Sequence, residues 1–511
     1  HVNNLLLHLA VVGLVFILGQ RLGLSIIASG FAALLFGVHP LHVESVAWIS
    51  QRKDVLYSCF YLLALLQYEN FLAQKKQRYY VWALFFGLCS ILSKPMAYSL
   101  PLILLLWDWC KGRKINWKVI GEKLPFVLLI GAVSLITYTA NSQATALSFG
   151  QCILVWIWVF IFHLQKFFSP YPLIPAYEMP QPITLGNFEY IAAVMAFVVL
   201  LGILFFIRRQ KWLVFAVLFY LLSNSMIILR AAWEFGNNTV VADRFMYLPS
   251  LGICLALGAF YQSVQQRLKT SPFYARFFVL ICAGIFSMLM FKTSAQTRVW
   301  KDSVTLWSQV IKYEPKKVLA YQNRAAAYVE QERYVLAMQD LEHAIMLAPQ
   351  QAILYYCRAD LFEKKGDWQS ALNDLDRSAS LNPDDALVYF SRGKVYQTLG
   401  QTQKALQDYN FAIAKKPDLD RAFYNRGIIF DEIGKTDLAL ADYAQVIRIN
   451  PKHGKVYNNR AFIYLARGEY EKARLDLFKA IAIDPRNEQA YSNLGSLAFA
   501  RQDYHNALYY F

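Results

Sequence analysis

The sequence is poor in charge: 17% of its 511 residues are charged, whereas 57% are hydrophobic. This excludes an ordinary soluble protein and points to membrane spans. The seven cysteines are scattered without a CxxC pair, and six lie in or beside apolar runs, which excludes a disulfide framework or a zinc site built on such pairs. Glycine-rich phosphate loops, GxSxG and HExxH are also missing, which argues against a nucleotide-driven or protease mechanism.

The basic excess lies in the apolar part of the chain. Residues 1–292 hold 22 Lys and Arg against 9 Asp and Glu, so 22 minus 9 gives a net charge of +13. The remaining 29 and 26 in residues 293–511 leave a net charge of +3. Basic loops beside membrane helices explain this pattern better than a nucleic-acid surface does. We therefore expect contact with membrane lipids and no nucleic-acid partner.

Eleven apolar runs are candidates for membrane helices, because about 20 apolar residues in a helix cross a hydrocarbon core about 30 Å thick. They lie near residues 3–19, 23–38, 55–72, 79–93, 96–110, 124–140, 150–167, 189–207, 212–229, 245–263 and 275–291. The basic clusters between them should face the cytoplasm. This places loops 39–54, 94–98 and 231–244 on the other side, provided that 150–167 is interfacial or re-entrant. Everything after Lys292 is then extracytoplasmic.

The rest of the chain is repetitive. Prolines recur every 34 residues, at Pro315, Pro349, Pro383, Pro417, Pro451 and Pro485. This is the period of the tetratricopeptide repeat, a helix–turn–helix unit. We predict an all-α protein, with a polytopic membrane helix bundle over 1–292 and a repeat superhelix (α-solenoid) over 293–511. The superhelix should comprise a half-repeat at 299–317, full repeats at 318–351, 352–385, 386–419, 420–453 and 454–487, and a partial repeat at 488–511.

Three polar columns run through the repeats. Arginines at 324, 358, 392, 426 and 460 precede aspartates at 340, 374, 408, 442 and 476. We interpret them as a structural Arg–Asp pair inside each repeat. The third column contains Asn323, Asn425, Asn459 and Asn493. Amides donate and accept hydrogen bonds, so this column is a candidate peptide-binding surface that grips a backbone without reading its sequence, with simple solvation as the alternative.

The three loops opposite the basic clusters hold the candidates for chemistry, since ionisable residues at membrane depth are often functional. These are His39, His42, Glu44, Arg52, Asp54, Lys94, Asp243, Arg244 and Tyr247. Arg52, Lys94 and Arg244 could clamp a lipid phosphate, and Glu44 could serve as a base or an orienting acid. Each also has an ordinary role open to it, such as a snorkelling lysine or an Asp243–Arg244 pair. The His39, His42 and Glu44 spacing fits no structural zinc pattern, so we assign no metal.

The motifs HPLHVESVAWISQRKDVL, LSKPMAYSLP and ADRFMYLPSLG, followed by the repeats, resemble the transmembrane and tetratricopeptide-repeat O-mannosyltransferases, with ISQRKDVL closer to bacterial relatives. The resemblance covers essentially the whole chain and implies a GT-C fold. It implies transfer of a sugar, such as mannose, from a polyprenyl-phosphate carrier to a hydroxyl of a protein acceptor outside the cytoplasm. The repeats would present the acceptor, and divalent-metal dependence stays open. The family's acidic pair precedes a helix like 3–19, so we expect the main base before residue 1 and a supporting role for Glu44.

Two other functions stay open. A non-enzymatic, membrane-anchored scaffold would use its repeats to recruit partners during envelope assembly. A transporter or flippase would carry charge in the middle of its spans, whereas charge here gathers at one membrane face, with Glu69 and Asp108 as the main exceptions. The expected location is a bacterial inner membrane, or the endoplasmic reticulum membrane in a eukaryote.

Overall fold

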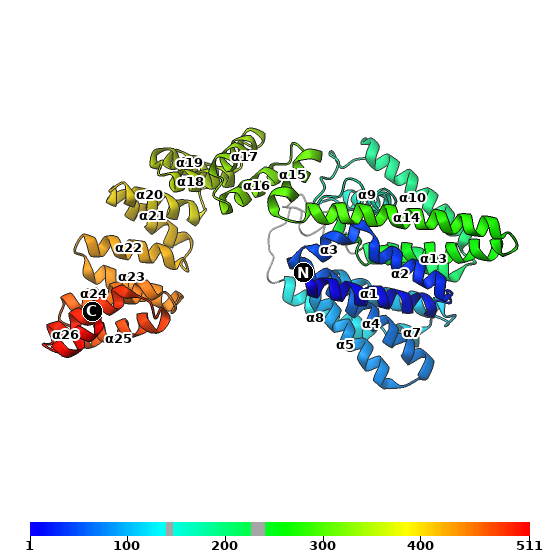
Figure 1. Cartoon of the computed structure of the whole chain (residues 1–511), viewed down its shortest axis with the longest axis horizontal. Coiled ribbons are helices and arrows are strands. Elements are labelled where there is room, and N and C mark those ends of the chain that lie inside the picture. The colour runs from blue at the N-terminus through cyan, green and yellow to red at the C-terminus, as the bar shows by residue number, and fades with distance from the viewer. Residues whose placement is uncertain (139–146, 226–240) are drawn as a thin grey trace. The chain divides into compact units, whose positions relative to one another are not determined.

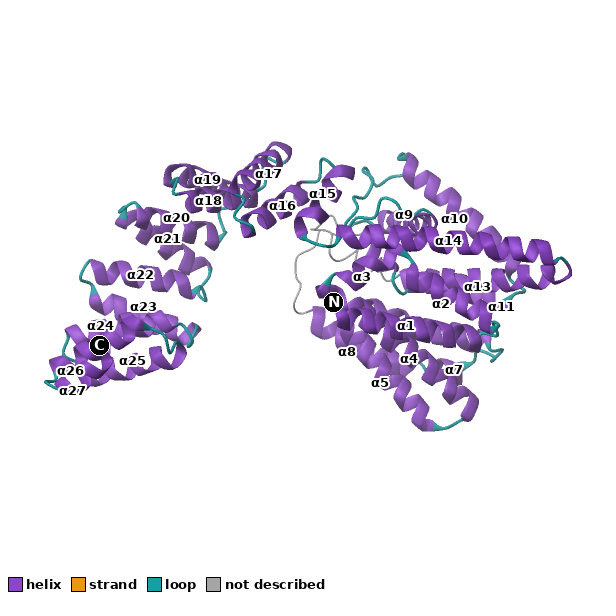
Figure 2. Cartoon of the chain, in the orientation of Figure 1, coloured by secondary structure: helices purple, strands orange, loops and turns teal. Residues whose placement is uncertain are grey.

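The computed structural model describes residues 1–138, 147–225 and 241–511, and its elements are helices joined by loops (Figures 1 and 2). Within these ranges no strand is formed, and Tyr177 and Val241 make an isolated antiparallel bridge. The backbone contacts divide the chain into two compact units, His1–Tyr313 and Glu314–Phe511. The predicted all-α class is confirmed.

The first unit combines long apolar helices with short ones. Its α-helices are α1 (Val2–Arg21), α2 (Ile26–Val38), α3 (Val43–Ala47), α4 (Arg52–Gln74), α5 (Gln77–Ser93), α6 (Leu100–Cys110), α7 (Trp117–Gly121), α8 (Leu124–Tyr138), α9 (Phe149–Phe168), α10 (Phe188–Ile207), α11 (Lys211–Asn224), α13 (Ser250–Arg267), α14 (Pro272–Val299) and α15 (Ser303–Tyr313). Short 3₁₀ turns lie between them: η1 (Pro40–His42), η2 (Ile49–Gln51), η3 (Pro95–Ser99), η4 (Asp243–Met246) and η5 (Leu268–Thr270).

Among the described helices, five are long and apolar enough to cross a membrane: α1, the continuous segment Ile49–Gln74, α9, α10 and α14. A sixth candidate is α2 with Pro40–Ala47, a pair bent by 50°. Several of the other predicted runs form helices shorter than about 20 residues, such as α5 with 17 and α6 with 11. The ends of the runs predicted at 124–140 and 212–229 lie outside the described residues. By length and composition α9 is a candidate for a spanning helix, and the interfacial or re-entrant position predicted for 150–167 stays a prediction. The extracytoplasmic side predicted for the repeats depends on that position and also stays a prediction.

Helix α13 packs closely against α11 and α2 through two glycines. A methyl group at Gly252 would lie 2.4 Å from the carbonyl oxygen of Ala216 in α11, and one at Gly258 would lie 2.9 Å from that of Ala28 in α2. Both distances are shorter than a carbon–oxygen contact allows. Small residues therefore let the backbones approach, as is usual between membrane helices, and α13 holds the η4 loop at a fixed place.

The second unit is a stack of paired helices (Figure 1). They are α16 (Val318–Glu330), α17 (Tyr334–Leu347), α18 (Ala352–Lys365), α19 (Trp368–Leu381), α20 (Ala386–Thr398), α21 (Thr402–Lys415), α22 (Asp420–Glu432), α23 (Thr436–Ile449), α24 (Gly454–Ala466), α25 (Tyr470–Ile483), α26 (Glu488–Ala500) and α27 (Tyr504–Tyr510). The predicted repeats each correspond to one pair. The boundary predicted at 292 and 293 falls inside α14, which continues to Val299, and α15 of the half-repeat belongs to the first unit.

The predicted Arg–Asp pairs form in all five full repeats. In the fourth, the Arg426 Nε and Nη2 atoms donate to the two carboxylate oxygens of Asp442 at 2.8 and 2.7 Å. The same two-bond geometry joins Arg324 to Asp340, Arg358 to Asp374, Arg392 to Asp408, and Arg460 to Asp476. The aspartates are buried, so each pair ties the two helices of its repeat together.

This geometry predicts that Arg426→Ala destabilises the repeat unit by about 3 kcal/mol, because it leaves Asp442 buried without its partner. Arg426→Lys should recover only part of the loss, since an ammonium cannot form both bonds of the guanidinium fork. Thermal unfolding of the full chain measures both. Equal stability of wild type and Arg426→Ala would show that the pair contributes nothing.

The asparagine column already has partners inside the array. The side-chain amide groups donate to the preceding repeat: Asn425 to Tyr409 Oη at 3.2 Å, Asn459 to Tyr424 Oη at 3.3 Å, and Asn493 to Asn458 Oδ1 at 2.8 Å. These bonds join successive repeats and occupy one donor of each amide. Peptide binding by this column, Asn323 included, stays a prediction.

Candidate functional site

The predicted polar loops meet at one end of the first unit. The turn η1 and helix α3 contact η4, and the start of α4 contacts η3. Glu44, on α3, is the main link between the first and last of these loops. Its Oε1 atom lies 2.5 Å from Arg244 Nη1, and its Oε2 atom accepts a hydrogen bond of 3.0 Å from the Arg244 backbone. Both carboxylate oxygens therefore hold Arg244.

A second ion pair lies beside the first. The Lys94 ammonium, at the end of α5, donates to Asp54 in the first turn of α4, and both side chains are buried. The Lys94 nitrogen is also 5.2 Å from the centre of the Phe245 ring, next to Arg244 in the chain. Burial lowers the pKa of Lys94 below its ordinary value, although Asp54 opposes this shift. The pair keeps a buried cation close to η4.

Asp243 has partners that the sequence did not indicate. Its Oδ1 atom accepts a hydrogen bond of 2.8 Å from Tyr177 Oη, in the proline-rich loop after α9. The Lys166 ammonium, on α9, lies 4.9 Å from the centre of the Tyr177 ring. Burial raises the pKa of Asp243 well above its ordinary value, and the nearby charge of Glu44 adds to the shift. Asp243 therefore pairs with Tyr177. Among the described residues it does not pair with its sequence neighbour Arg244, which was one alternative predicted from the sequence.

The histidines and Tyr247 lie in the interior and not at the surface. His39 contacts the carbonyl oxygen of Phe167 through Nε2 and the Leu41 backbone N–H through Nδ1. His42 contacts the Phe36 carbonyl oxygen and Ser250 Oγ. Tyr247 is fully buried, with its hydroxyl 2.6 Å from Nδ1 of His8. Each of these nitrogens and the hydroxyl already has a protein partner, so the cluster supports the loops from within.

The exposed edge of the site contains Arg52 and Trp48. Arg52 is exposed, and its Nε atom donates to Asn4 Oδ1 at 3.2 Å. The guanidinium carbon of Arg244 lies 5.6 Å from the centre of the Trp48 ring, and Trp48 is 38% exposed. Trp48 was not among the residues predicted from the sequence. The available signal was an aromatic residue inside the first polar motif, HPLHVESVAWISQRKDVL.

Taken together, the site is a buried network of three charged or polar pairs below an exposed arginine and tryptophan. In the described ranges, no three His, Cys, Asp or Glu side chains are grouped so that they could hold a metal ion. Two cations, Arg244 and Lys94, are held in place by carboxylates, and Arg52 stands nearest to solvent. Such an arrangement can bind an anionic group at the membrane surface.

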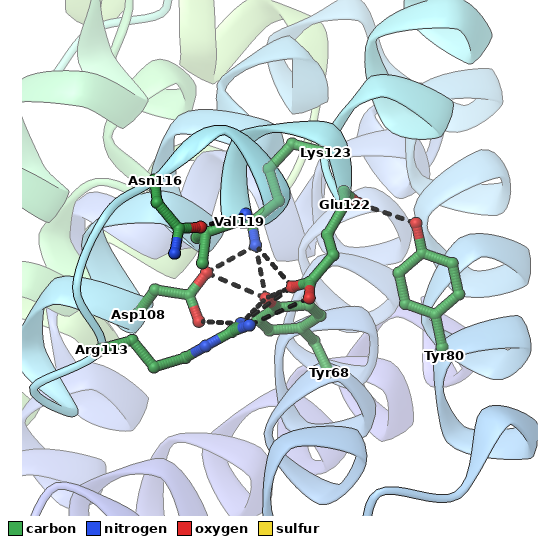
Figure 3. A network of polar contacts seen from close by, with 8 residues as sticks. All are labelled: Tyr68, Tyr80, Asp108, Arg113, Asn116, Val119, Glu122 and Lys123. Atoms are coloured by element: carbon green, nitrogen blue, oxygen red, sulfur yellow. Dashed lines mark hydrogen bonds and ion pairs between the residues drawn. The ribbon is translucent and has the colours of Figure 1, made fainter.

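A separate charged network lies at the C-terminal ends of α4 and α6, away from the candidate site (Figure 3). Asp108 of α6 accepts from Tyr68 Oη at 2.9 Å, from Arg113 Nη1 at 2.9 Å and from Lys123 Nζ at 2.5 Å. Glu122 completes the network, with its Oε2 atom 2.8 Å from Arg113 Nη1. Asp108, which looked like an isolated exception in the sequence, is therefore fully paired.

Models of the tetratricopeptide repeat match residues 318–351, 360–426, 420–453, 443–475 and 462–503. The second unit is a tetratricopeptide-repeat array. Among solved structures it is similar to YrrB, described as "a TPR protein with an unusual peptide-binding site", at 22% identity and a TM-score of 0.31, over 36% of this chain and 95% of YrrB.

Similarity to named enzymes extends across both units. The human protein O-mannosyl-transferase TMTC3 is 24% identical over 403 residues, which cover 66% of this chain and 41% of that protein. Mouse TMTC2, with the same description, is 31% identical over 150 residues, covering 27% of this chain and 18% of TMTC2. The chain thus spans less than half the length of these relatives. The predicted resemblance to O-mannosyl-transferases with tetratricopeptide repeats is supported, at modest identity.

Proposed function

We propose that this protein is a membrane glycosyltransferase of the GT-C type, which moves a mannose-like sugar from a polyprenyl-phosphate carrier to a hydroxyl of a protein acceptor on the extracytoplasmic side. The observation that carries the proposal is the convergence of Arg52, Lys94 and Arg244 from three separate loops at one end of the bundle. The similarity to O-mannosyl-transferases supports the reaction class. The repeats would bind the acceptor or a partner.

In the proposed reaction the acceptor oxygen attacks the anomeric carbon of the sugar. The bond from that carbon to the carrier phosphate breaks, and its electron pair leaves with the phosphate. The acceptor proton passes to a carboxylate base. Cations fixed before the reaction stabilise the charge that develops on the leaving phosphate without reorganising.

The residues differ in their suitability for these roles. Arg52 and Arg244 can reach a phosphate at the surface, while Lys94 acts from below through its charge. Glu44 holds Arg244 with both oxygens, so we assign it a positioning role and not that of the base. Trp48 offers a flat apolar ring on which the carrier or the sugar can pack.

Arg52→Ala tests this assignment best, because the side chain is exposed and its loss should not disturb the fold. We expect at least a tenfold lower rate of sugar transfer from a polyprenyl-phosphate mannose donor into protein, measured in membranes that contain equal amounts of each variant. Arg276→Ala, which removes another exposed arginine on α14, serves as the matched control. Unchanged transfer in Arg52→Ala would refute the phosphate-binding role.

The alternative is a non-enzymatic scaffold, favoured by one observation: the buried charges of the site neutralise each other in pairs. A scaffold needs such pairs only for stability. It predicts no transfer by the wild-type chain from any lipid-linked sugar, together with capture of a partner that is lost when Asn425 and Asn459 are changed to alanine.

A further inference from the structure

A second surface feature lies on the hairpin of α4 and α5, away from the candidate site. Here a hollow of about 330 Å³ is lined by Gln67, Arg78, Tyr79, Trp82 and Phe86. Arg78 is in the first turn of α5 and Lys94 follows its last residue. Sixteen residues of helix separate them by about 24 Å, so the hollow lies near the opposite end of the helix.

One wall of the hollow, formed by Arg78 and Tyr79, is basic. The exposed Arg78 donates from Nη2 to Tyr79 Oη at 2.9 Å, and its guanidinium carbon lies 4.8 Å from the centre of the Tyr79 ring. The turn before α5 adds two exposed cations, Lys75 and Lys76, which neighbour the lining residues in the chain and do not themselves line the hollow. Across the described part of the chain, no ion pair is formed by these three side chains. Their charge is therefore available to an external anion.

The other wall, formed by Trp82 and Phe86, is aromatic and faces outward. The rings of Trp82 and Phe86 are stacked with centres 5.7 Å apart, and Phe86 stacks on Phe60 of α4 at 6.2 Å. Trp82 and Phe85 are each half exposed, and the same face of α5 also exposes Val81 at 61%. An exposed apolar helix face in a protein with membrane-spanning helices is a surface toward lipid chains, and tryptophan favours the level of the headgroups.

We propose that this hollow binds one anionic phospholipid, with the phosphate on Arg78 and the basic turn and the glycerol and upper acyl chain against Trp82 and Phe86. The proposal rests on charge complementarity and on the arrangement of the walls along α5, where the basic wall at the start of the helix is followed by the aromatic wall. A free phosphate would use only the basic wall, and a zwitterionic lipid would gain less from three unpaired cations. The site is independent of the transferase reaction and of which side the repeats occupy.

Native mass spectrometry of the full chain, delipidated in detergent and titrated with phosphatidylglycerol or phosphatidylcholine, tests the proposal. We expect the wild type to bind one phosphatidylglycerol at least tenfold more tightly than phosphatidylcholine. Arg78→Gln should lose this preference, and Trp82→Ala should weaken both lipids. Arg276→Gln, another exposed arginine on an apolar helix, should behave as wild type.

Three outcomes would overturn the site. One is equal affinity of the wild type for the two lipids. Another is unchanged phosphatidylglycerol binding in Arg78→Gln. The third is competition by glycerol 3-phosphate at the same concentration, since it would assign the basic wall to a soluble phosphate. Thermal unfolding of each variant shows whether it is folded, and Arg78→Lys, which keeps the charge, should retain most of the preference if Arg78→Gln does not fold.

Discussion

Replacing Arg244 by methionine is expected to destabilise the folded protein by about 3–5 kcal/mol, because removing one partner of a buried ion pair leaves the other charge uncompensated. Glu44 is 3% exposed, and both of its oxygens accept from Arg244. The Arg244 side chain also donates to the Pro175 carbonyl oxygen at 3.0 Å. Methionine keeps the apolar stem but supplies neither bond, so only the backbone N–H remains for Glu44.

The double variant Glu44→Gln/Arg244→Met separates lost charge from lost packing. With the carboxylate neutralised, most of the stability should return, and a double-mutant cycle then gives a coupling free energy of about 2 kcal/mol or more. Thermal unfolding in detergent provides the measurement. Strictly additive effects of the two single changes would show that the pair is not coupled and that the geometry at α3 and η4 is incidental.

Variants of Arg244 and of Arg52 report on different properties of the site. Loss of transfer in an Arg244 variant has two causes, a missing phosphate contact and a loosened loop, which activity alone does not separate. Arg52 is exposed, and within the described part of the chain its side chain forms a hydrogen bond only to Asn4. Its variants therefore report on binding, while those of Arg244 and Glu44 report first on the shape of the site.

The repeat unit was predictable in detail because its signal is periodic. Arg426 and Asp442 are sixteen residues apart, and the 34-residue period returns the same spacing five times. In a helix–turn–helix unit this spacing brings the two side chains together across the turn. The pair could be inferred without any long-range information.

The membrane unit was predictable only in outline. Hydropathy finds the apolar runs and their ends near Pro40 and Pro95. Among the described residues, five helices, or six with the bent pair, are candidates to cross a membrane by length and composition, so the number of spans stays a prediction. The loops with Glu44 and Arg244 could be predicted to share one side from the basic clusters, on the condition that 150–167 does not cross the membrane. Their partners could not, since Tyr177 lies in a loop without periodicity and pairs with Asp243 across 66 positions.

The histidines show a further limit. His39 and His42 stand among charges in the sequence and were therefore predicted as candidate substrate-binding residues. In the structure His39 stacks on Phe167 with ring centres 4.3 Å apart, and His42 lies 4.9 Å from Tyr247. An imidazole satisfies both nitrogens as readily in a core as at a ligand, and spacing alone does not distinguish the two cases.

Asp108→Asn is expected to cause the other large loss of stability, about 3–5 kcal/mol at neutral pH. Lys123 is 2% exposed and its ammonium is held by Asp108 and by Tyr68 Oη (Figure 3). Burial already lowers the pKa of Lys123 below its ordinary value of 10.5, and Asp108 opposes this shift. Without the carboxylate the charged form loses its main support, so the pKa of Lys123 in the folded protein falls further.

The sign of the pH dependence follows from this lowered pKa. Between the folded-state pKa and the unfolded value of about 10.5, the unfolded chain binds more protons, so the stability of Asp108→Asn rises with pH over that interval relative to wild type. The double variant Asp108→Asn/Lys123→Met removes the titrating group and should lose this extra pH dependence while regaining stability. Thermal unfolding from pH 7 to pH 10 measures both effects. A parallel pH profile for wild type and Asp108→Asn would mean that Lys123 is charged by other partners, with Glu122 as the first candidate at 3.6 Å.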